Sequence, residues 1–255
     1  ARPEPPVSQR DLQLLRRLSG RRRARLEEGR FVVDGPTLVG EALASPVEVT
    51  AVYAEPAAPG DVLEAARGAG IPVHDVAEGA LAKATSPVTP QPLAAIAAIP
   101  PAPDPAAVLH GLVLVLVGVS DPGNAGTLFR VAEAAGATAV VSCGDAVDVW
   151  NPKVVRASAG SIFRVPHLDA GDVDACTDAL RRAGLVLVAC DGRADRVHDT
   201  VDLTGDVAVL LGNEAHGLPP AVTAAAHRVV SIPMLGAVES LNVAMTGTVM
   251  AFESA

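Results

Sequence analysis

Two nearly continuous runs of apolar residues limit the folds that this chain can adopt. They read LVLVLV at residues 112–117 and VAVLL at residues 207–211. A strand with one face in water alternates apolar and polar residues, whereas a strand buried on both faces has no such alternation. Strands of the second kind occur in parallel sheets that helices cover on both sides. The second half of the chain is therefore predicted to be an α/β domain with a mostly parallel sheet and helices on both faces.

Shorter apolar runs alternate with helical segments through the rest of this half. Strands are expected at 138–143, 163–166, 185–190 and 229–232, and helices at 124–136, 151–159, 172–183 and 240–253. Ligands of open parallel sheets bind beyond the carboxyl ends of the strands. The loops that follow the strands are therefore where functional residues are expected.

The first hundred residues have the pattern of a smaller α/β domain. Its strands are expected near 31–33, 47–54, 71–76 and 93–99, with helices between them. The stretch PPAPDP at 100–105 has four prolines in six residues, which is typical of a semi-rigid linker. The predicted division is a first domain at 1–99, a linker at 100–106 and a second domain at 107–255.

Charge is distributed unevenly along the chain. The net charge is −9, yet eight arginines lie between Arg10 and Arg30. Screening limits charge effects to about 8–10 Å at ordinary salt, so a local basic surface can act beside an acidic remainder. Such a surface predicts a salt-sensitive contact with RNA phosphates. Aromatic residues make up only 2% of the chain, so binding by stacked rings is not expected.

Several classes of protein are disfavoured by what the sequence lacks. Cys143, Cys176 and Cys190 are widely spaced and form no CxxC pair, and His216 has no partner at metal-ligand spacing, so neither a disulfide framework nor a metal site is expected. The longest strongly apolar stretch, 112–119, is too short to span a bilayer. No secretory signal is visible, and a cytoplasmic protein is expected.

Polar residues follow several of the predicted strands. The stretch SDPGNAGTLFR at 120–130 places a turn before a helix that carries Arg130, and it fits neither a Walker A loop nor the GxGxxG spacing. GNEAH at 212–216 follows a buried strand, and ESLN at 239–242 precedes an apolar helix. Taken one at a time, helix capping explains much of each pattern, with Asn124, Glu214 and Ser240 as the expected caps.

Taken together and in order, these stretches resemble a known family. DPGNAGTLFRVAEAAGA (121–137), LLGNEAHGL (210–218) and SIPMLGAVESLNVAMTG (231–247) are similar to the motifs of the SpoU (TrmH-like) group of the SPOUT superfamily, which are S-adenosylmethionine-dependent RNA 2′-O-ribose methyltransferases. The first half looks like the substrate-binding domain of that family, related in fold to small RNA-binding ribosomal proteins. That similarity rests on GRFVVDGPTLVGEAL (29–43) and SPVTPQPLAAIA (86–97).

The resemblance implies a set of structural and functional expectations. The second domain should contain a C-terminal trefoil knot and a cup for S-adenosylmethionine, and the protein should be a homodimer that acts on RNA without a metal ion. The cofactor-binding residues implied are Leu211, Gly212, Ile232 and Leu241. The catalytic residues implied are Arg130, Asn124, Glu214, Ser240 and Asn242. The RNA-binding residues expected are Arg21, Arg22, Arg23, Arg25 and Arg156.

Several alternatives stay open at the level of sequence. Arg130 could act as a base in a dry pocket, but a guanidinium is effectively always protonated, so we favour a role in holding phosphate and stabilising developing alkoxide charge. The target is expected to be ribosomal RNA rather than tRNA. The alternatives are a base methyltransferase and an RNA-binding protein with a vestigial cofactor site. The presence of SLN at 240–242 together with GNE at 212–214 favours ribose methylation over base methylation.

Overall fold

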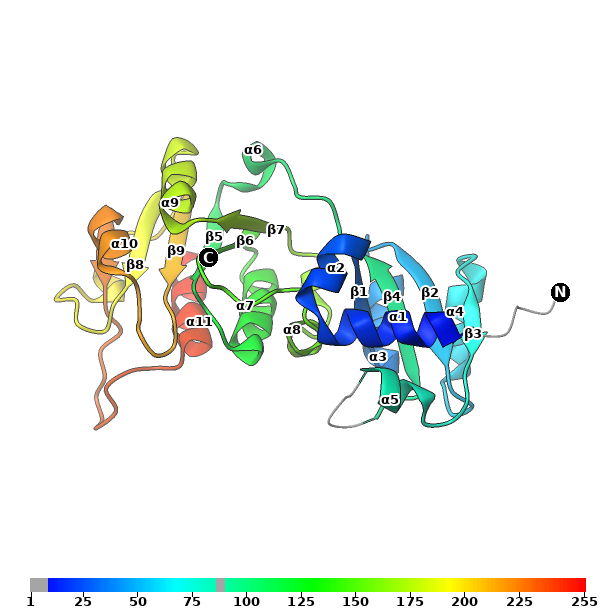
Figure 1. Cartoon of the computed structure of the whole chain (residues 1–255). Helices are drawn as coiled ribbons and strands as arrows, with labels where there is room; N and C mark the ends of the chain where they lie inside the picture. The colour runs from blue at the N-terminus through cyan, green and yellow to red at the C-terminus, as the bar shows by residue number, and fades with distance from the viewer. Residues whose placement is uncertain (1–8, 86–89) are drawn as a thin grey trace. The chain divides into compact units, whose positions relative to one another are not determined.

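The computed structural model describes residues 9–85 and 90–255, which form two compact units (Figure 1). The first unit comprises the described residues up to Pro101 together with Asp148–Arg164, and the second comprises Ala102–Val147 and Val165–Ala255. The start of the SPVTPQPLAAIA stretch, at 86–89, lies outside the described residues. In the part of the chain that is described, no helix has the length and apolar character needed to cross a membrane.

The first unit contains a mixed four-stranded sheet with the order β1-β4-β2-β3. Its strands are β1 (Arg30–Asp34), β2 (Val49–Ala54), β3 (Val73–Asp75) and β4 (Leu93–Ala98). The central strand β4 pairs antiparallel with β1 and β2, whereas β2 and β3 are parallel. The helices between and before them are α1 (Gln9–Gly20), α2 (Arg22–Glu28), α3 (Pro36–Leu43), α4 (Gly60–Gly68) and α5 (Ala80–Thr85).

A segment from the second half of the sequence completes the core of this first unit. It carries α8 (Pro152–Ala157) and the 3₁₀ helix η1 (Ser161–Phe163). The ring centroids of Trp150 and Phe163 lie 4.7 Å and 6.2 Å from that of Phe31 in β1. These three rings hold 148–164 in the first unit, although the sequence prediction assigned that segment to the second domain. Contacts between rings so far apart in sequence cannot be predicted from the order of the helices and strands along the chain.

The second unit is built on a six-stranded sheet in which every pairing is parallel, with the order β10-β8-β9-β5-β6-β7. This confirms the predicted α/β class. The strands are β5 (Leu112–Val117), β6 (Ala139–Cys143), β7 (His167–Gly171), β8 (Val186–Cys190), β9 (Val207–Leu211) and β10 (Arg228–Val230). The helices are α6 (Pro105–Val108), α7 (Pro122–Ala134), α9 (Val173–Arg182), α10 (Pro220–Ala225) and α11 (Val243–Ser254), with the 3₁₀ helix η2 at His198–Thr200.

The apolar runs at 112–117 and 207–211 form the two central strands of this sheet. All residues of β5 and β9 are buried, and the two strands are neighbours. Val113 and Val115 point to the face that α9 covers, where they join the core around Leu180. On the other face α11 packs against α7 and β9. The trefoil knot implied by the resemblance stays a prediction.

Three local predictions are wrong in detail. The strand expected at 163–166 lies at β7, because Phe163 turns into the core of the first unit instead. Helix α11 begins at Val243 rather than 240, since Asn242 and not Ser240 accepts hydrogen bonds from the first free backbone N–H groups. In the same way Asp121, not Asn124, is the N-cap of α7.

Candidate active site

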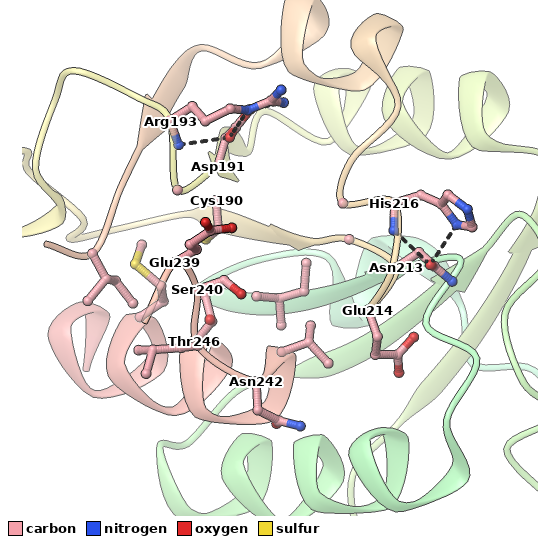
Figure 2. Close-up of a pocket in the computed structure, with 18 of the residues that line it drawn as sticks. Cys190, Asp191, Arg193, Asn213, Glu214, His216, Glu239, Ser240, Asn242 and Thr246 are labelled. Atoms are coloured by element: carbon pink, nitrogen blue, oxygen red, sulfur yellow. Dashed lines mark hydrogen bonds and ion pairs between the residues drawn. The ribbon is translucent and has the colours of Figure 1, made fainter. Parts of the chain in front are cut away.

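A cavity of about 860 Å³ opens at the carboxyl ends of β8 and β9 in the second unit (Figure 2). Three segments form its wall, namely the residues after β8, the loop after β9, and the stretch from the end of β10 into α11. All four residues expected to bind the cofactor line it, which are Leu211, Gly212, Ile232 and Leu241. The position agrees with the general rule for ligands of parallel sheets.

The loop after β9 needs glycine at its first position. A Cβ atom at Gly212 would lie 2.4 Å from the carbonyl carbon of Gly217 and 2.5 Å from the nitrogen of Leu218. Asn213 closes the loop: its N–H donates to the Gly217 carbonyl at 3.1 Å, and its Nδ2 donates to the Gly118 carbonyl at 2.8 Å. The backbone therefore doubles back on itself tightly, and Glu214 at the tip has a fixed position.

Glu214 accepts four hydrogen bonds from one short segment. Its Oε2 accepts from the N–H and the hydroxyl of Ser120, both at 3.1 Å, and its Oε1 accepts from Asp121 N–H and Asn124 Nδ2, both at 3.0 Å. Partial burial acts to raise the pKa of this carboxyl, but the hydrogen bonds from Asn124 and the backbone outweigh it and lower the pKa to about 2. Glu214 is therefore a carboxylate anion at neutral pH that ties the β9 loop to the start of α7.

Two asparagines extend this network to the third segment. Asn242 Nδ2 donates to Asn124 Oδ1 at 2.9 Å, and Asn242 Oδ1 accepts from Ala244 N–H at 2.8 Å as the cap of α11. Each asparagine uses its oxygen and its nitrogen in different bonds, so both amide orientations are fixed. The three motifs of the sequence thus meet at Asn124, Glu214 and Asn242, and the catalytic roles that the resemblance implies for these residues stay predictions.

Ser240 and Arg130 lie in different positions relative to the cavity. Ser240 lines it and is exposed. Arg130 is exposed on α7 and does not belong to the lining residues. Within residues 9–85 and 90–255, its guanidinium takes part in no hydrogen bond or ion pair. Its positive charge is thus not neutralised by any carboxylate of the described residues.

Sequence reasoning missed several residues of the wall. Asp191 and Arg193 follow β8, and Met234 and Thr246 belong to the third segment. Asp191 Oδ1 accepts from Arg193 Nε at 3.2 Å, and its Oδ2 accepts from Arg193 Nη2 at 3.1 Å. Hydrogen bonds from the Arg193 side chain and backbone hold the pKa of the Asp191 carboxyl below its ordinary value. The signal available was the position after a buried strand, but CDGRAD matches no motif.

The cavity fits an adenosyl ligand with an amino-acid end. Apolar side chains from Leu211, Ile232, Met234 and Leu241 offer surface for a purine ring, and the lining also includes acidic and basic residues. Ligand pockets of about 300–1,000 Å³ commonly combine apolar walls with few polar groups. Among the described residues no group of three or more potential metal ligands occurs.

The arginines expected to bind RNA belong to the first unit and divide into two kinds. Arg21, Arg22 and Arg23 are exposed. Arg25 is only 3% exposed: its Nε donates to Asp148 Oδ2 at 2.8 Å, and its Nη1 donates to the Leu18 carbonyl at 2.6 Å. Its predicted RNA contact is therefore wrong in this structure, because burial occupies the guanidinium with structural bonds.

Arg156 has a partner of its own in the first unit. Its Nη1 donates to Asp34 Oδ2 at 3.1 Å, and its side chain keeps 33% of its surface exposed. Burial raises the pKa of the Asp34 carboxyl, although the charge and hydrogen bond of Arg156 act in the opposite direction. An RNA phosphate that binds Arg156 would therefore share its guanidinium with the buried carboxyl group of Asp34.

Comparisons with known proteins agree with this geometry. The SpoU rRNA Methylase family matches residues 111–252, and an MRM3-like substrate binding domain matches residues 10–95. The 23S rRNA (guanosine(2553)-2′-O)-methyltransferase RlmP of Bacillus subtilis is 30% identical over 233 residues, covering 91% of this chain and 90% of that protein. The 23S rRNA (guanosine-2′-O-)-methyltransferase RlmB of Xanthomonas axonopodis pv. citri is 40% identical over 149 residues, and the match spans 60% of its length.

Solved structures extend the similarity to the whole chain. The SpoU methyltransferase AviRb of Streptomyces viridochromogenes in complex with AdoMet has a TM-score of 0.85 and 29% identity, covering 95% of this chain and 96% of that one. An AdoMet-bound rRNA methyltransferase of Sinorhizobium meliloti has a TM-score of 0.85 and 28% identity over 98% of this chain. Both structures hold the cofactor that the cavity residues fit.

A parallel sheet with a cup at its strand ends, together with a small mixed-sheet unit, defines a two-domain RNA 2′-O-methyltransferase that uses S-adenosylmethionine. The family match covers more than half of the chain. The chain belongs to the SpoU rRNA methylase family, and the resemblance found in its three motifs is confirmed.

Proposed function

We propose that this chain methylates the ribose 2′-hydroxyl of one nucleotide in 23S ribosomal RNA. The observation that carries the proposal is the network from Asn242 through Asn124 to Glu214 beside the cavity. A ribosomal target is supported by the similarity to RlmP, which extends over nine tenths of both chains. S-adenosylmethionine, when bound, supplies an electrophilic methyl group on its sulfonium sulfur.

Glu214 acts in this proposal as a positioning residue. A carboxyl with a pKa of about 2 is a weak base at neutral pH, so it is poorly suited to take the hydroxyl proton. Its four hydrogen bonds instead hold the Ser120–Asp121 turn and the Asn124 amide in one arrangement. Such preorganisation aligns the substrate hydroxyl with the methyl group.

Arg130 is the residue that acts on the RNA in this proposal. It is exposed, and no carboxylate in the described residues neutralises it. A permanently protonated guanidinium attracts a phosphate next to the target ribose and stabilises the negative charge that develops on the 2′-oxygen. Because Arg130 does not line the cavity of its own subunit, in this proposal it reaches the 2′-oxygen from the second subunit of the homodimer. Ser240 lies in the cavity wall, where its hydroxyl can donate to the cofactor or the ribose.

The first unit provides the broader RNA contact. Three exposed arginines follow one another at the start of α2, namely Arg21, Arg22 and Arg23. Their positive charges can attract the phosphates of the RNA backbone. Contacts of this kind position the RNA and carry no sequence code. The choice of nucleotide therefore depends on the shape of the RNA around the target.

The proposed assembly is a homodimer in the cytoplasm, where ribosomal RNA is modified. Its support is the exposure of apolar residues in the third segment and α11: Leu235 is fully exposed, Val238 is 62% exposed, Met245 is 61% exposed and Phe252 is 57% exposed. Met245 and Phe252 are seven residues apart on α11 and so lie on one face of the helix, and an exposed apolar face marks an interaction surface. Light scattering should give twice the chain mass for the wild type and the chain mass for Phe252→Glu.

Methyl transfer from isotopically labelled S-adenosylmethionine to total RNA tests the function. The RNA is separated after reaction into 23S, 16S and tRNA fractions. The proposal expects label in 23S RNA that lacks the modification. Label confined to tRNA would overturn the ribosomal target, and binding of RNA without any transfer would favour a vestigial cofactor site.

A further inference from the structure

Two arginines of the first unit are paired with carboxylates in opposite ways. Arg25 is a buried cation, and Asp148 and the Leu18 carbonyl occupy its guanidinium. In the other pair the carboxylate is the buried partner, since the side chain of Asp34 is 1% exposed and that of Arg156 is 33% exposed. A buried cation serves the fold, whereas a partly exposed cation held by a buried anion is also presented to a ligand.

Asp34 has only part of the hydrogen bonding that a buried carboxylate needs. Its Oδ2 accepts from Arg156 Nη1 at 3.1 Å, but its Oδ1 is buried and has no hydrogen-bond partner within residues 9–85 and 90–255. An unsatisfied buried carboxylate oxygen costs stability, and burial raises the pKa of this carboxyl group. An apolar side chain would serve the packing as well, so the carboxylate needs an explanation other than stability.

Arg156 keeps two of its nitrogens for another acceptor. In the described part of the chain its Nη1 bonds to Asp34, and Nε and Nη2 take part in no hydrogen bond. A guanidinium presents its donors in a fixed plane that matches the oxygens of a phosphate. Because Asp34 holds one end of this plane, it also sets the direction in which the remaining donors point.

A second cation lies on the same side of α8. Lys153 is exposed and precedes Arg156 by three residues, a spacing that places two side chains next to each other on a helix. Asn151 caps this helix by accepting from the Lys153 N–H at 3.0 Å, and the Lys153 ammonium group has no partner among the described residues. Two neighbouring cations of this kind suit the phosphates of an RNA backbone.

The short helix α8 is held in place on both sides. It packs against β1, the strand that ends in Asp34. Beyond its other end, Ala159 has a φ of 48° and is the one non-glycine residue with a positive φ in the described ranges. Left-handed backbone costs energy in alanine, and such strain occurs often near functional residues. The position of Arg156 relative to Asp34 is therefore fixed by the backbone as well as by the ion pair.

We propose that Asp34 is a positioning residue for RNA binding, which directs the Arg156 guanidinium towards an RNA phosphate, and that Lys153 is the second cation of this phosphate site. The inference rests on the proposed function, because it names residues that act on the RNA. A carboxylate that positions a cation strengthens the binding of a polyanion, whereas a carboxylate that acts only through its charge weakens it. The sign of the effect of Asp34 therefore separates the two roles.

Filter binding of an unmodified 23S RNA transcript at graded salt concentrations tests the proposal. Lys153→Gln and Arg156→Gln should each weaken binding about fivefold and lower the slope of log affinity against log salt by about one, since each removes a phosphate contact. Asp34→Asn should also weaken binding and lower that slope, although it removes a negative charge. Asp34→Asn combined with Arg156→Gln should lose no more affinity than Arg156→Gln alone, because Asp34 acts through Arg156.

Two further variants control for charge and for folding. Asp75→Asn, at an exposed aspartate of β3 in the same unit, is the matched control and should leave RNA affinity and its salt dependence unchanged. Asp34→Glu keeps a carboxylate and should retain part of the affinity that Asp34→Asn loses. All binding is measured below the thermal unfolding transition of each variant, so that only folded proteins are compared.

Three results would overturn the proposal. They are tighter or unchanged RNA binding by Asp34→Asn, equal losses in Asp34→Asn and Asp34→Glu, and additive losses when Asp34→Asn and Arg156→Gln are combined. Failure of the wild type to bind 23S RNA would instead refute the proposed function. The two failures are distinguishable, because the first concerns differences between variants and the second concerns the wild type alone.

Discussion

Asn242 Nδ2 donates a 2.9 Å hydrogen bond to Asn124 Oδ1, across 118 positions of sequence. The same Asn242 caps α11 through its Oδ1. One side chain therefore fixes the start of a helix and one end of the network that reaches Glu214. The two roles use different atoms, so substitutions can separate them.

Asn242→Asp should keep the helix cap and lose the bond to Asn124. An aspartate oxygen still accepts from the backbone N–H groups of α11, but it cannot donate to Asn124 Oδ1. Thermal unfolding should stay near that of the wild type while methyl transfer falls sharply. Asn242→Ala should lose the cap as well, which costs about 1 kcal/mol of unfolding free energy. Equal activity in Asn242→Asp and the wild type would show that the Asn124 bond is dispensable.

Glu214 should contribute a pH-dependent part of the stability. Its pKa in the folded chain, about 2, lies below the ordinary glutamate value, so the contribution is present above pH of about 4. It is lost as the pH falls from about 4 towards 2, because the carboxylate then takes up a proton. The stability difference between the wild type and Glu214→Gln, measured by denaturant unfolding, should be constant near neutral pH and shrink in that window. A difference that changes around pH 7 would be inconsistent with the low pKa.

Gly212→Ala should distort the cavity, whereas Gly236→Ala should not. The new Cβ at 212 would meet backbone atoms of Gly217 and Leu218, which cannot rotate away as a side-chain end can. A loss of about 1–3 kcal/mol in unfolding free energy and of S-adenosylmethionine binding is expected. Position 236, in the third segment, has no atom within 4 Å of its Cβ and serves as the matched control. Calorimetry and thermal unfolding of the two variants provide the comparison.

Two arginines close in sequence should behave in opposite ways. Arg25→Ala leaves Asp148, whose side chain is 10% exposed, without its cation, and should cost about 3–5 kcal/mol of stability. Arg21→Ala removes an exposed charge and should change stability by less than about 0.5 kcal/mol. It should instead weaken RNA binding and lower the salt dependence of that binding. Loss of RNA affinity in a fully folded Arg25→Ala protein would contradict the structural role given to Arg25.

The parallel sheet and the meeting of the three motifs could be predicted from sequence because each leaves a local pattern. Fully apolar strands such as β5 and β9 are visible as runs, and GNEAH and ESLN are ordered stretches. Helix α2 was missed because RRARLEE has the composition of a solvated charge cluster, and only the fold buries Ala24 and Arg25. Strand β7 was misplaced because an edge strand such as HLDAG needs no apolar run.

The site could be predicted only as far as its motifs extend. Asn124, Glu214 and Asn242 were expected, but their hydrogen bonds to one another depend on contacts between distant segments. Asp191 and Arg193 carry no motif, and their place in the wall depends on β8 lying beside β9. The helix caps at Asp121 and Asn242 depend on the first residue of each helix, and α7 and α11 start a few residues away from the positions predicted from sequence.

The most direct test of the account is the chemical position of the transferred methyl group and its dependence on Arg130. RNA methylated by the wild type is digested to nucleosides and analysed by mass spectrometry. The account predicts a single 2′-O-methyl nucleoside from 23S RNA, nearly complete loss of it with Arg130→Ala at unchanged S-adenosylmethionine affinity, and partial activity with Arg130→Lys. A methyl group on a base, or a near wild-type rate for Arg130→Ala, would contradict it.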